Sequence, residues 1–287
     1  MVPTAIIEKL RQVLQEEMLQ TRPITGGDIN QAYLVSTPNS IFFLKTNSAP
    51  FALQMFEAEA KGLAALSAAK ALCVPTVLEV GTAGGMGFLL MTYHASAIRP
   101  DGFWENFGAG LAELHRTTAP EFGLDHENYI GSLPQRNCLH STWAAFYIEE
   151  RLLPQIELAL QNKKLQAADY ESFSKMFRRM PDLCPAEPPA LVHGDLWSGN
   201  FLCGTAGVPV VFDPAISYSH REMDLAMTRL FGGFDRAFYQ GYEEAWPLAP
   251  GFEQRLPVYQ LYYLLVHVNL FGGSYVEQLR SALHPFI

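Results

Sequence analysis

Two carboxylates and one amide near residue 200 form the most informative pattern in the chain. Asp195 and Asn200 lie five residues apart in LVHGDLWSGN (191–200), and Asp213 follows in VVFDP (210–214). This interval lets an aspartate accept the proton of an acceptor hydroxyl while the asparagine binds Mg²⁺. Asp213 would add a second oxygen ligand, which suits a hard cation. The pattern therefore predicts phosphoryl transfer, with Asp195 as the base and Asn200 and Asp213 as metal ligands.

A β-hairpin is expected between the two metal-binding residues. Apolar residues 201–203 and 208–212 flank a Gly-Thr-Ala-Gly turn (204–207), which is the pattern of two short strands joined by a tight connection. We expect this hairpin to return Asp213 beside Asn200. Taken alone, His-Gly-Asp is typical of an ordinary turn and Asp213 of a strand cap, but their joint order and spacing favour the phosphotransferase interpretation.

The N-terminal third would have to supply a lysine for the ATP phosphates and a carboxylate to hold it. Lys45 ends the strand-like run 41–45. Glu59 lies on the apolar stripe of a helix that begins near Phe51, where an unpaired carboxylate would be costly to bury. We therefore expect Lys45 and Glu59 to pair, and Glu57 to be solvated. The residues of the apolar stripe are Leu53, Phe56, Leu63 and Leu66.

Gly26 and Gly27 are the candidates for a phosphate-covering loop. They lie in residues 24–33, between an expected N-terminal helix (1–20) and a strand that starts at Tyr33. Adjacent glycines allow the backbone to approach phosphates closely. The loop lacks a GxGxxG or Walker A pattern, so a simple hairpin turn is the alternative. Its position upstream of Lys45 favours the phosphate role.

The sequence pattern changes near residue 93. A second hairpin is expected from 77–80 and 88–92, and the chain is mostly helical after it. We predict an ATP-binding lobe over residues 1–93 and a catalytic and acceptor-binding lobe over 94–287. Tyr93 and His94 would form the hinge, whose backbone can pair with the adenine edge.

Three other aromatic or imidazole side chains have competing interpretations. Trp197, inside the catalytic loop, is well placed to contact a bound acceptor, although a loop tryptophan can also anchor its turn. His193 is expected to hold the shape of the loop. His115 is more typical of a satisfied core histidine than of a catalytic base. Aromatic residues at helical spacing around Trp143 indicate core packing.

Four longer stretches carry a resemblance to a known family. They are FGLDHENYIGSLPQRN (122–137), WAAFYIEERLLPQI (143–156), DPAISYSHREMDLAM (213–227) and YYLLVHVNLFGGSYV (262–276). With HGDLWSGN, they resemble the fructosamine kinase (ketosamine-3-kinase) family of the aminoglycoside phosphotransferase and protein-kinase-like superfamily. The resemblance implies an α+β, bilobal protein-kinase-like fold, with a small antiparallel-sheet N-lobe and a mostly helical C-lobe.

The same resemblance implies the reaction. ATP with Mg²⁺ would phosphorylate the 3-hydroxyl of a free or protein-linked ketosamine, giving a product prone to lose the sugar, and so repair glycated amines. It assigns the same roles to Asp195, Asn200, Asp213, Lys45 and Glu59 as the spacing does. Asp224 would brace the catalytic loop through hydrogen bonds. The chain departs from the family pattern at Ser217 and Ser219.

Composition argues against several other function classes. The chain has 287 residues, a net charge of −9 and no block of basic residues, so nucleic acids and anionic membranes are poor candidate partners. No N-terminal signal is visible, and the apolar run 261–271 is too short to span a bilayer. The four cysteines are scattered, and we expect them to be reduced and buried. A cytoplasmic monomer is the expectation.

Two alternatives remain open. One is a kinase for another hydroxylated amine, such as an aminoglycoside or choline-like acceptor. Such pockets usually carry acidic clusters, and none is evident near Trp197. The other is a nucleotide-binding module without catalysis. Such a module would be expected to have lost at least one ion-pair or metal position, whereas every one of them is present.

Overall fold

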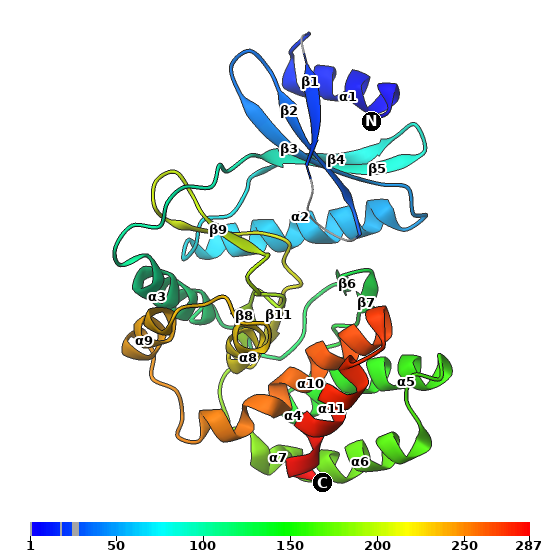
Figure 1. Ribbon diagram of the computed structural model, residues 1–287, viewed down its shortest axis with the longest axis vertical. Helices are drawn as coiled ribbons and strands as arrows, with labels where there is room; N and C mark the ends of the chain where they lie inside the picture. Colours follow the sequence, from blue (N-terminus) through cyan, green and yellow to red (C-terminus); the bar gives the residue numbers. More distant parts are fainter. Residues whose placement is uncertain (1, 18, 25–28) are drawn as a thin grey trace. The chain divides into compact units, whose positions relative to one another are not determined.

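The computed structural model describes residues 2–17, 19–24 and 29–287 (Figure 1). The chain divides into two compact units. The first unit comprises Met1–Phe103 and Phe201–Pro214, and the second comprises Trp104–Asn200 and Ala215–Ile287. Residues 94–103 and 201–214 thus belong to the first unit by compactness, whereas the sequence pattern places the lobe boundary after residue 93.

The first unit is built on a five-stranded antiparallel sheet (Figure 1). Its strands are β1 (Gln20–Ile24), β2 (Gln31–Ser36), β3 (Ile41–Asn47), β4 (Val77–Ala83) and β5 (Met86–Thr92), in the order β1-β2-β3-β5-β4. Its helices are α1 (Thr4–Leu14) and α2 (Ala52–Ala69), and its separate hairpin consists of β9 (Phe201–Cys203) and β10 (Pro209–Val211). An antiparallel sheet with covering helices agrees with the predicted small lobe.

The two helices of this unit use opposite faces of the sheet. Ile6 and Leu10 of α1 belong to the same apolar cluster as Leu44 of β3. Successive side chains in a strand point to opposite faces, so Lys45 points away from α1. Glu59 of α2 meets Lys45 on that second face.

The N-terminal helix is shorter than predicted. It ends at Leu14, because Gln15 adopts a left-handed conformation with φ of 54°. The chain then forms β1, so the expectation of a helix as far as residue 20 is wrong, and β2 begins at Gln31 rather than at Tyr33. The strand β1 contains Pro23 and pairs only with β2 in the described residues, a position at the sheet edge where proline is tolerated.

Both predicted hairpins are present. The strands β4 and β5 are longer than expected and meet at Gly84 and Gly85, whose φ values of 60° and 78° suit glycine. In the hairpin after the catalytic loop, Val211 pairs with Phe201. The backbone N–H of Val211 also donates to the carbonyl of Cys73 at 2.9 Å. That contact ties the hairpin into the first unit.

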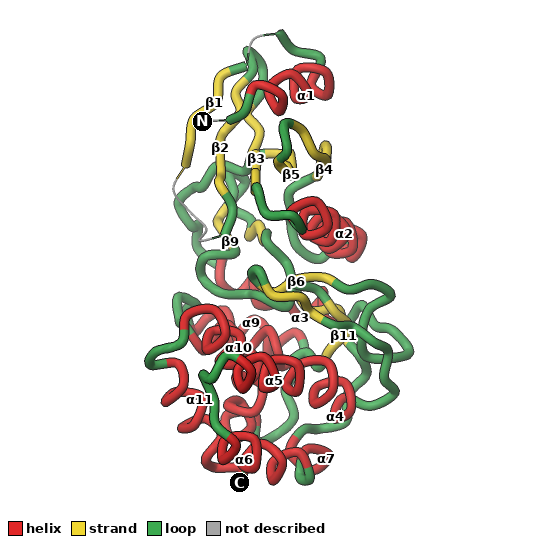
Figure 2. The backbone as a smooth tube through the Cα atoms, turned by 90° about the vertical axis from the view of Figure 1, so that its right-hand side faces the viewer, coloured by secondary structure: helices red, strands yellow, loops and turns green. Residues whose placement is uncertain are grey.

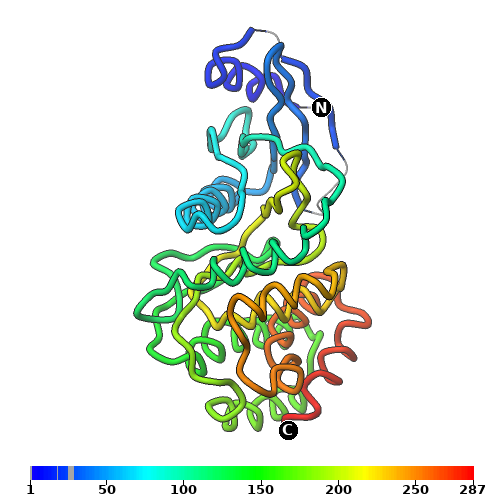
Figure 3. The backbone as a smooth tube through the Cα atoms, turned by 90° about the vertical axis from the view of Figure 1, so that its left-hand side faces the viewer, coloured from blue at the N-terminus to red at the C-terminus, as the bar shows by residue number. Residues whose placement is uncertain are grey.

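The second unit is mostly helical, as predicted (Figures 1 and 2). Its helices are α3 (Phe103–His115), α4 (Trp143–Phe146), the π-helix η1 (Tyr147–Leu152), α5 (Leu153–Gln161), α6 (Ala167–Phe177), α7 (Met180–Leu183), α8 (Glu222–Leu230), α9 (Arg236–Ala245), α10 (Phe252–Phe271), α11 (Tyr275–Leu283) and the 3-10 helix η2 (His284–Phe286). The strand pairs are β6 (Asn128–Ile130) with β7 (Leu133–Gln135), and β8 (Ala190–Val192) with β11 (Ser217–Ser219). Figure 3 shows α11, in red, packed beside α10, in orange.

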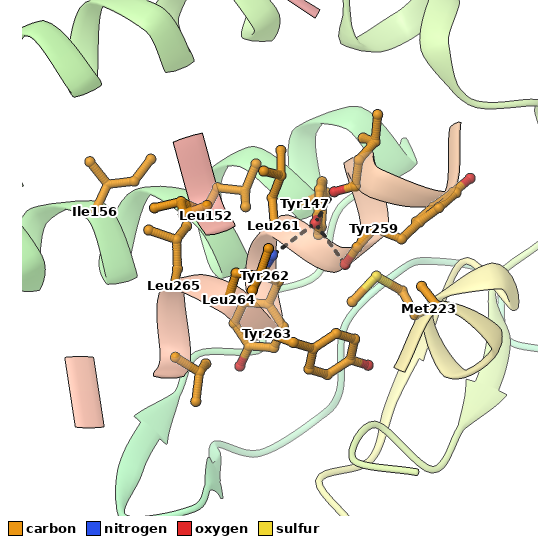
Figure 4. Close-up of a cluster of buried hydrophobic side chains, with 14 of the residues drawn as sticks. Tyr147, Leu152, Ile156, Met223, Tyr259, Leu261, Tyr262, Tyr263, Leu264 and Leu265 are labelled. Carbon is orange, nitrogen blue, oxygen red and sulfur yellow. Dashed lines mark hydrogen bonds between the residues drawn. The ribbon is translucent and has the colours of Figure 1, made fainter. Parts of the chain in front are cut away.

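The core of the second unit surrounds α10 (Figure 4). Tyr147, the first residue of η1, is fully buried against this helix. Its hydroxyl donates to the carbonyl of Val258 at 2.6 Å and accepts from the N–H of Tyr262 at 3.3 Å. These two backbone groups are four residues apart and would normally bond each other in an α-helix. The Tyr147 hydroxyl therefore bonds both backbone groups of one turn of α10.

The remaining sequence predictions concern cysteines and membrane spans. All four cysteines are free, and Cys203 is buried whereas Cys138, in the loop after β7, is exposed. The expectation of buried cysteines therefore holds for Cys203 and is wrong for Cys138, while Cys73 and Cys184 are only partly buried. Across the described ranges, none of the helices combines the length and the apolar character needed to cross a bilayer.

Candidate active site

Three charged side chains meet in the first unit. The Nζ atom of Lys45, on β3, lies 2.7 Å from Oε1 of Glu59, on α2. The same Nζ atom also bonds Oδ1 of Asp213, which follows β10. Lys45 is buried, and the side chain of Glu59 is only 11% exposed. The predicted pairing of Lys45 with Glu59 is confirmed, and Asp213 joins it as a second carboxylate.

Burial and the charge of neighbouring groups have opposing effects on the pKa values in this cluster. Burial alone would lower the pKa of Lys45, but the charges of Asp213 and Glu59 outweigh it and the pKa is raised. Lys45 is therefore a permanent cation at neutral pH. The pKa of Glu59 is raised to about 7, because burial and the nearby charge of Asp213 together outweigh the attraction of Lys45. Two carboxylates share one ammonium group, so Glu59 keeps its proton to a higher pH than a free carboxyl group does.

Asp213 has an unusual backbone conformation. Its φ is 57°, in the left-handed region, which costs a residue other than glycine about 1–2 kcal/mol. Its side chain is 41% exposed, in contrast with the buried ammonium group that it contacts. Strained backbone of this kind is concentrated at functional sites. The conformation thus presents one carboxylate to both Lys45 and solvent.

The catalytic loop of the second unit is held by hydrogen bonds. Nδ2 of Asn200 donates to the backbone carbonyl of Asp195 at 2.8 Å and to its Oδ2 atom at 3.0 Å. Asn200 is buried, so its orientation is fixed. The amide group also carries an oxygen atom, Oδ1, that could bind a metal ion. This amide oxygen and the Asp213 carboxylate are the kinds of donor that Mg²⁺ prefers, so both residues fit such a cation.

Asp224, on α8, braces the loop as the resemblance implies. Its two carboxylate oxygens accept the backbone N–H groups of His193 at 2.7 Å and Gly194 at 2.8 Å. Burial raises the pKa of Asp224, but the contacts with His115 and with the loop N–H groups outweigh burial and the net shift is downward. Asp224 is therefore a buried anion that fixes the backbone just before Asp195.

Two histidines behave as expected. His115 is fully buried, with Nε2 3.1 Å from Asp224 and Nδ1 2.8 Å from the hydroxyl of Tyr242. It is a satisfied core histidine, as predicted. Nδ1 of His193 accepts the backbone N–H of Asp195 at 3.3 Å, which stabilises the turn of the loop.

The backbone conformation of Gly194 and its close contact with Ala215 explain why this position is a glycine. Its φ is 83°, and a Cβ atom there would lie 2.0 Å from the carbonyl oxygen of Ala215. Any side chain would therefore collide with backbone. The residue that precedes Asp195 is locked against the segment that follows Asp213.

The other predicted site residues are less constrained. Trp197 is 39% exposed, and its ring lies over Gly199, where a Cβ atom would come within 2.3 Å of it. This position is compatible with both anchoring the turn and contacting an acceptor. Tyr93 and His94 follow β5 in irregular structure, and burial lowers the pKa of His94. Gly26 and Gly27 lie outside the described residues.

Comparison with known proteins decides the family. The fructosamine kinase family matches residues 2–287. The chain belongs to the fructosamine kinase family. It is 41% identical over 269 residues to a probable ketoamine kinase of Enterococcus faecium, which covers 92% of this chain and 94% of the relative. It is also 34% identical over 277 residues to the ketosamine-3-kinase of Mus musculus, covering 87% of this chain and 89% of the relative.

Solved structures agree with this family. A Thermobifida fusca protein described as a candidate fructosamine-3-kinase superposes with a TM-score of 0.90 at 33% identity, covering 99% of this chain and 98% of that chain. The aminoglycoside phosphotransferase APH(4)-Ia superposes with a TM-score of 0.61 at 15% identity, covering 96% and 97%. That second likeness shows that the chain shares its fold with an aminoglycoside phosphotransferase.

One group of buried polar residues near the catalytic loop was not predicted as functional. Asn128, Gln135 and Asn137 are buried amides on or beside the β6–β7 hairpin. The signal available in the sequence was their position in 122–137, one of the stretches that is particular to fructosamine kinases. Polar residues in such short strands give no periodicity from which burial could be inferred.

Proposed function

We propose that this chain is an ATP-dependent kinase that phosphorylates the 3-hydroxyl of ketosamines, free or protein-linked. The observation that carries the proposal is the braced Asp195–Asn200 pair. It occurs in a chain whose relatives along nearly its whole length are named as ketoamine and ketosamine-3-kinases. A protein-ribulosamine 3-kinase of rice, 37% identical over 92% of this chain, supports a protein-linked acceptor. The proposed setting is a cytoplasmic monomer.

The nucleotide would be held by residues of the first unit. Lys45, kept charged and oriented by Glu59, would bind the ATP phosphates. The backbone at Tyr93 and His94 would pair with adenine, and the loop of Gly26 and Gly27 would cover the phosphates. Asn200 and Asp213 would hold Mg²⁺, which when bound neutralises charge that develops on the transferred phosphoryl group.

Asp195 would act on the acceptor. Its carboxylate would take the proton of the 3-hydroxyl as that oxygen bonds the γ-phosphorus. The bond from the γ-phosphorus to the β,γ-bridging oxygen breaks, and ADP leaves with that electron pair. Asn200 holds the carboxylate by its 3.0 Å hydrogen bond, so Asp195 needs little reorganisation. Trp197 would pack against the bound acceptor.

The test is Mg²⁺-dependent ADP release with ribulose-lysine, fructose-lysine, an aminoglycoside and choline. We expect turnover with the two ketosamines alone, and their relative rates would rank the sugars. Aminoglycoside or choline turnover would move the enzyme to another branch of the superfamily. ATP binding without turnover of any acceptor would indicate a nucleotide-binding module.

Two variants make this test specific. Asp195→Asn should lower turnover by about 10²–10⁴-fold while ATP binding is retained. Asp182→Asn is the matched control, because Asp182 is an exposed aspartate on α7 of the same unit. Appreciable turnover by Asp195→Asn would contradict its role as base.

A further inference from the structure

Figure 1 labels the two strands of the β6–β7 hairpin. Three side chains on or beside this hairpin form a chain of buried amides. Nε2 of Gln135 donates to Oδ1 of Asn128 at 2.8 Å, and Nδ2 of Asn137 donates to the same oxygen at 2.9 Å. All three side chains are buried. Burying amide groups is unfavourable unless they are hydrogen-bonded. Their presence therefore calls for a reason beyond packing, since apolar residues of similar size would fill the same space.

The amides also hold the segment that follows Asp213. Nε2 of Gln135 donates to the carbonyl of Ala215 at 3.1 Å, and Nδ2 of Asn128 donates to the carbonyl of Ile216 at 2.8 Å. Two successive backbone carbonyls are thus fixed by two side chains from one hairpin. The hairpin determines where this segment lies.

Ala215 in turn contacts the catalytic loop. Its N–H donates to the carbonyl of His193 at 2.9 Å. Its carbonyl oxygen lies where a Cβ atom on Gly194 would approach to 2.0 Å. Ala215 therefore touches both residues that precede Asp195, one by a hydrogen bond and the other by direct packing. A displacement of Ala215 would be transmitted to the residue proposed as base.

The other end of the amide chain is anchored in the helical core. The hydroxyl of Tyr262, on α10, donates to Oε1 of Gln135 at 2.7 Å. Nη2 of Arg151 donates to Oδ1 of Asn137 at 2.7 Å, and its guanidinium carbon lies 4.5 Å from the ring centroid of Phe146 and 5.7 Å from that of Tyr262. Hydrogen bonds and aromatic rings thus fix the position of the amide chain.

The burial of Arg151 shows that this arrangement has a cost in free energy. Arg151 is buried, and no carboxylate of the described residues lies within ion-pairing distance of its guanidinium group. Burial lowers its pKa, which is the expected effect of desolvating a cation. Such a side chain is costly to bury. Its acceptors are carbonyl and amide oxygens, which include the backbone oxygen of Arg136 and the side chain of Asn137.

We propose that Gln135 and Tyr262 are positioning residues for phosphoryl transfer: through Ala215, they fix the backbone that carries Asp195. The proposal rests on the proposed kinase function. It explains why the donors of the amide chain are directed at the carbonyls of Ala215 and Ile216. Neither residue is assigned a contact with the substrate. Misplacing a catalytic group by about 1 Å can cost about 100-fold in rate.

The test compares two tyrosine hydroxyls of the same core (Figure 4). Tyr262→Phe removes only the bond to Gln135, and Gln135→Met removes every donor and acceptor of that amide. Tyr147→Phe is the matched control, since it removes a buried hydroxyl whose partners are backbone groups of α10 and not a side chain of the amide chain. Each variant is assayed for kcat, acceptor KM, ATP affinity, thermal unfolding and backbone hydrogen exchange.

We expect kcat to fall about 10-fold to 100-fold in Tyr262→Phe and Gln135→Met, with ATP affinity within about twofold of the wild type. The double variant should be no slower than Gln135→Met, because both changes act through one amide. Hydrogen exchange in residues 192–200 and at Ala215 should become faster in both variants. Tyr147→Phe should lower the unfolding temperature without changing kcat or exchange in these segments.

Two outcomes separate the proposals. If the wild type turns over no acceptor, the kinase function fails, and exchange in residues 192–200 still decides whether the hairpin positions the loop. If kcat and that exchange stay at wild-type values while only the unfolding temperature falls, the positioning role is overturned and the hairpin contributes stability alone. If Gln135→Met does not fold, Tyr262→Phe still tests the positioning role, because it is the more conservative change.

Discussion

Lys45 in the first unit and Asp195 in the second are positioned in different ways. Lys45 is held by ion pairs with Glu59 and Asp213, so its environment depends on the charge of two carboxylates. Asp195 is held by hydrogen bonds from Asn200 and by a backbone that Asp224 braces. Ion pairs respond to pH and to a bound cation, whereas bonds to backbone N–H groups do so far less. The group proposed to bind the nucleotide therefore depends on the charge of its neighbours, whereas the proposed base is held by hydrogen bonds and a braced backbone.

The largest expected effect is on kcat and comes from replacing Asp195. Replacing Asp195 by Asn removes the proton acceptor but keeps the size and the contact with Asn200. General bases contribute about 10²–10⁴-fold to rate, and we expect a loss in kcat of that order. ATP affinity, measured by isothermal titration calorimetry, should be unchanged. A loss of ATP affinity equal to the loss in kcat would mean that the change spreads beyond the base.

Replacing Asp224 by Ala tests the brace. The change leaves the N–H groups of His193 and Gly194 and the ring of His115 without their buried anionic partner. Removing one member of a buried charged network costs about 3–5 kcal/mol, and we expect a loss of that order in the free energy of unfolding. Urea unfolding measures it. Asp235→Ala is the control: Asp235 is an exposed aspartate that caps α9, and its loss should cost about 1 kcal/mol.

The pKa of His220 predicts how the stability of the second unit changes at acidic pH. This pKa is lowered from 6.5 to about 4, because burial, with smaller contributions from Arg221 and Arg255, outweighs the opposing charge of Glu187. The unfolded chain therefore binds the extra proton between pH 6.5 and 4, and the free energy of unfolding falls on acidification through that interval. We expect His220→Gln to remove a dependence worth about 3 kcal/mol. An unchanged pH profile of unfolding in this variant would contradict the prediction.

The pKa of Glu59 predicts the opposite pH dependence of stability for the first unit. This pKa is raised from 4.5 to about 7, so the folded chain binds the extra proton between these values. The free energy of unfolding then falls as pH rises from 4.5 to 7. Glu59→Gln should remove this contribution, worth at most about 3 kcal/mol. Glu57→Gln is the matched control, because Glu57 is exposed on the same helix and its change should stay within about 0.5 kcal/mol.

Local patterns in the sequence were enough for much of the site. Period-two alternation and helical spacing predicted that Lys45 and Glu59 would meet, because both signals lie within single elements. The hairpin after the catalytic loop followed from its turn residues. The contact of Lys45 with Asp213 joins residues 168 positions apart, and no local pattern encodes its geometry.

Other features could not be predicted for similar reasons. The end of α1 at Leu14 depends on one left-handed residue, Gln15, which is not a typical helix terminator. The π-helix at Tyr147 and the bond between Tyr262 and Gln135 depend on packing between elements more than 100 residues apart. Sequence spacing identifies residues that share one element, whereas contacts between elements have to be observed.

The bonds between the Tyr147 hydroxyl and α10 have a consequence for the coupling between η1 and α10. A continuous helix resists stretching along its axis because every turn is closed by its own hydrogen bonds. In α10, the turn from Val258 to Tyr262 shares its bonding with a side chain from η1. A shift of this turn would therefore displace Tyr147, and with it the π-helix that also carries Arg151. The hydroxyl of one tyrosine thus links the position of α10 to the position of η1.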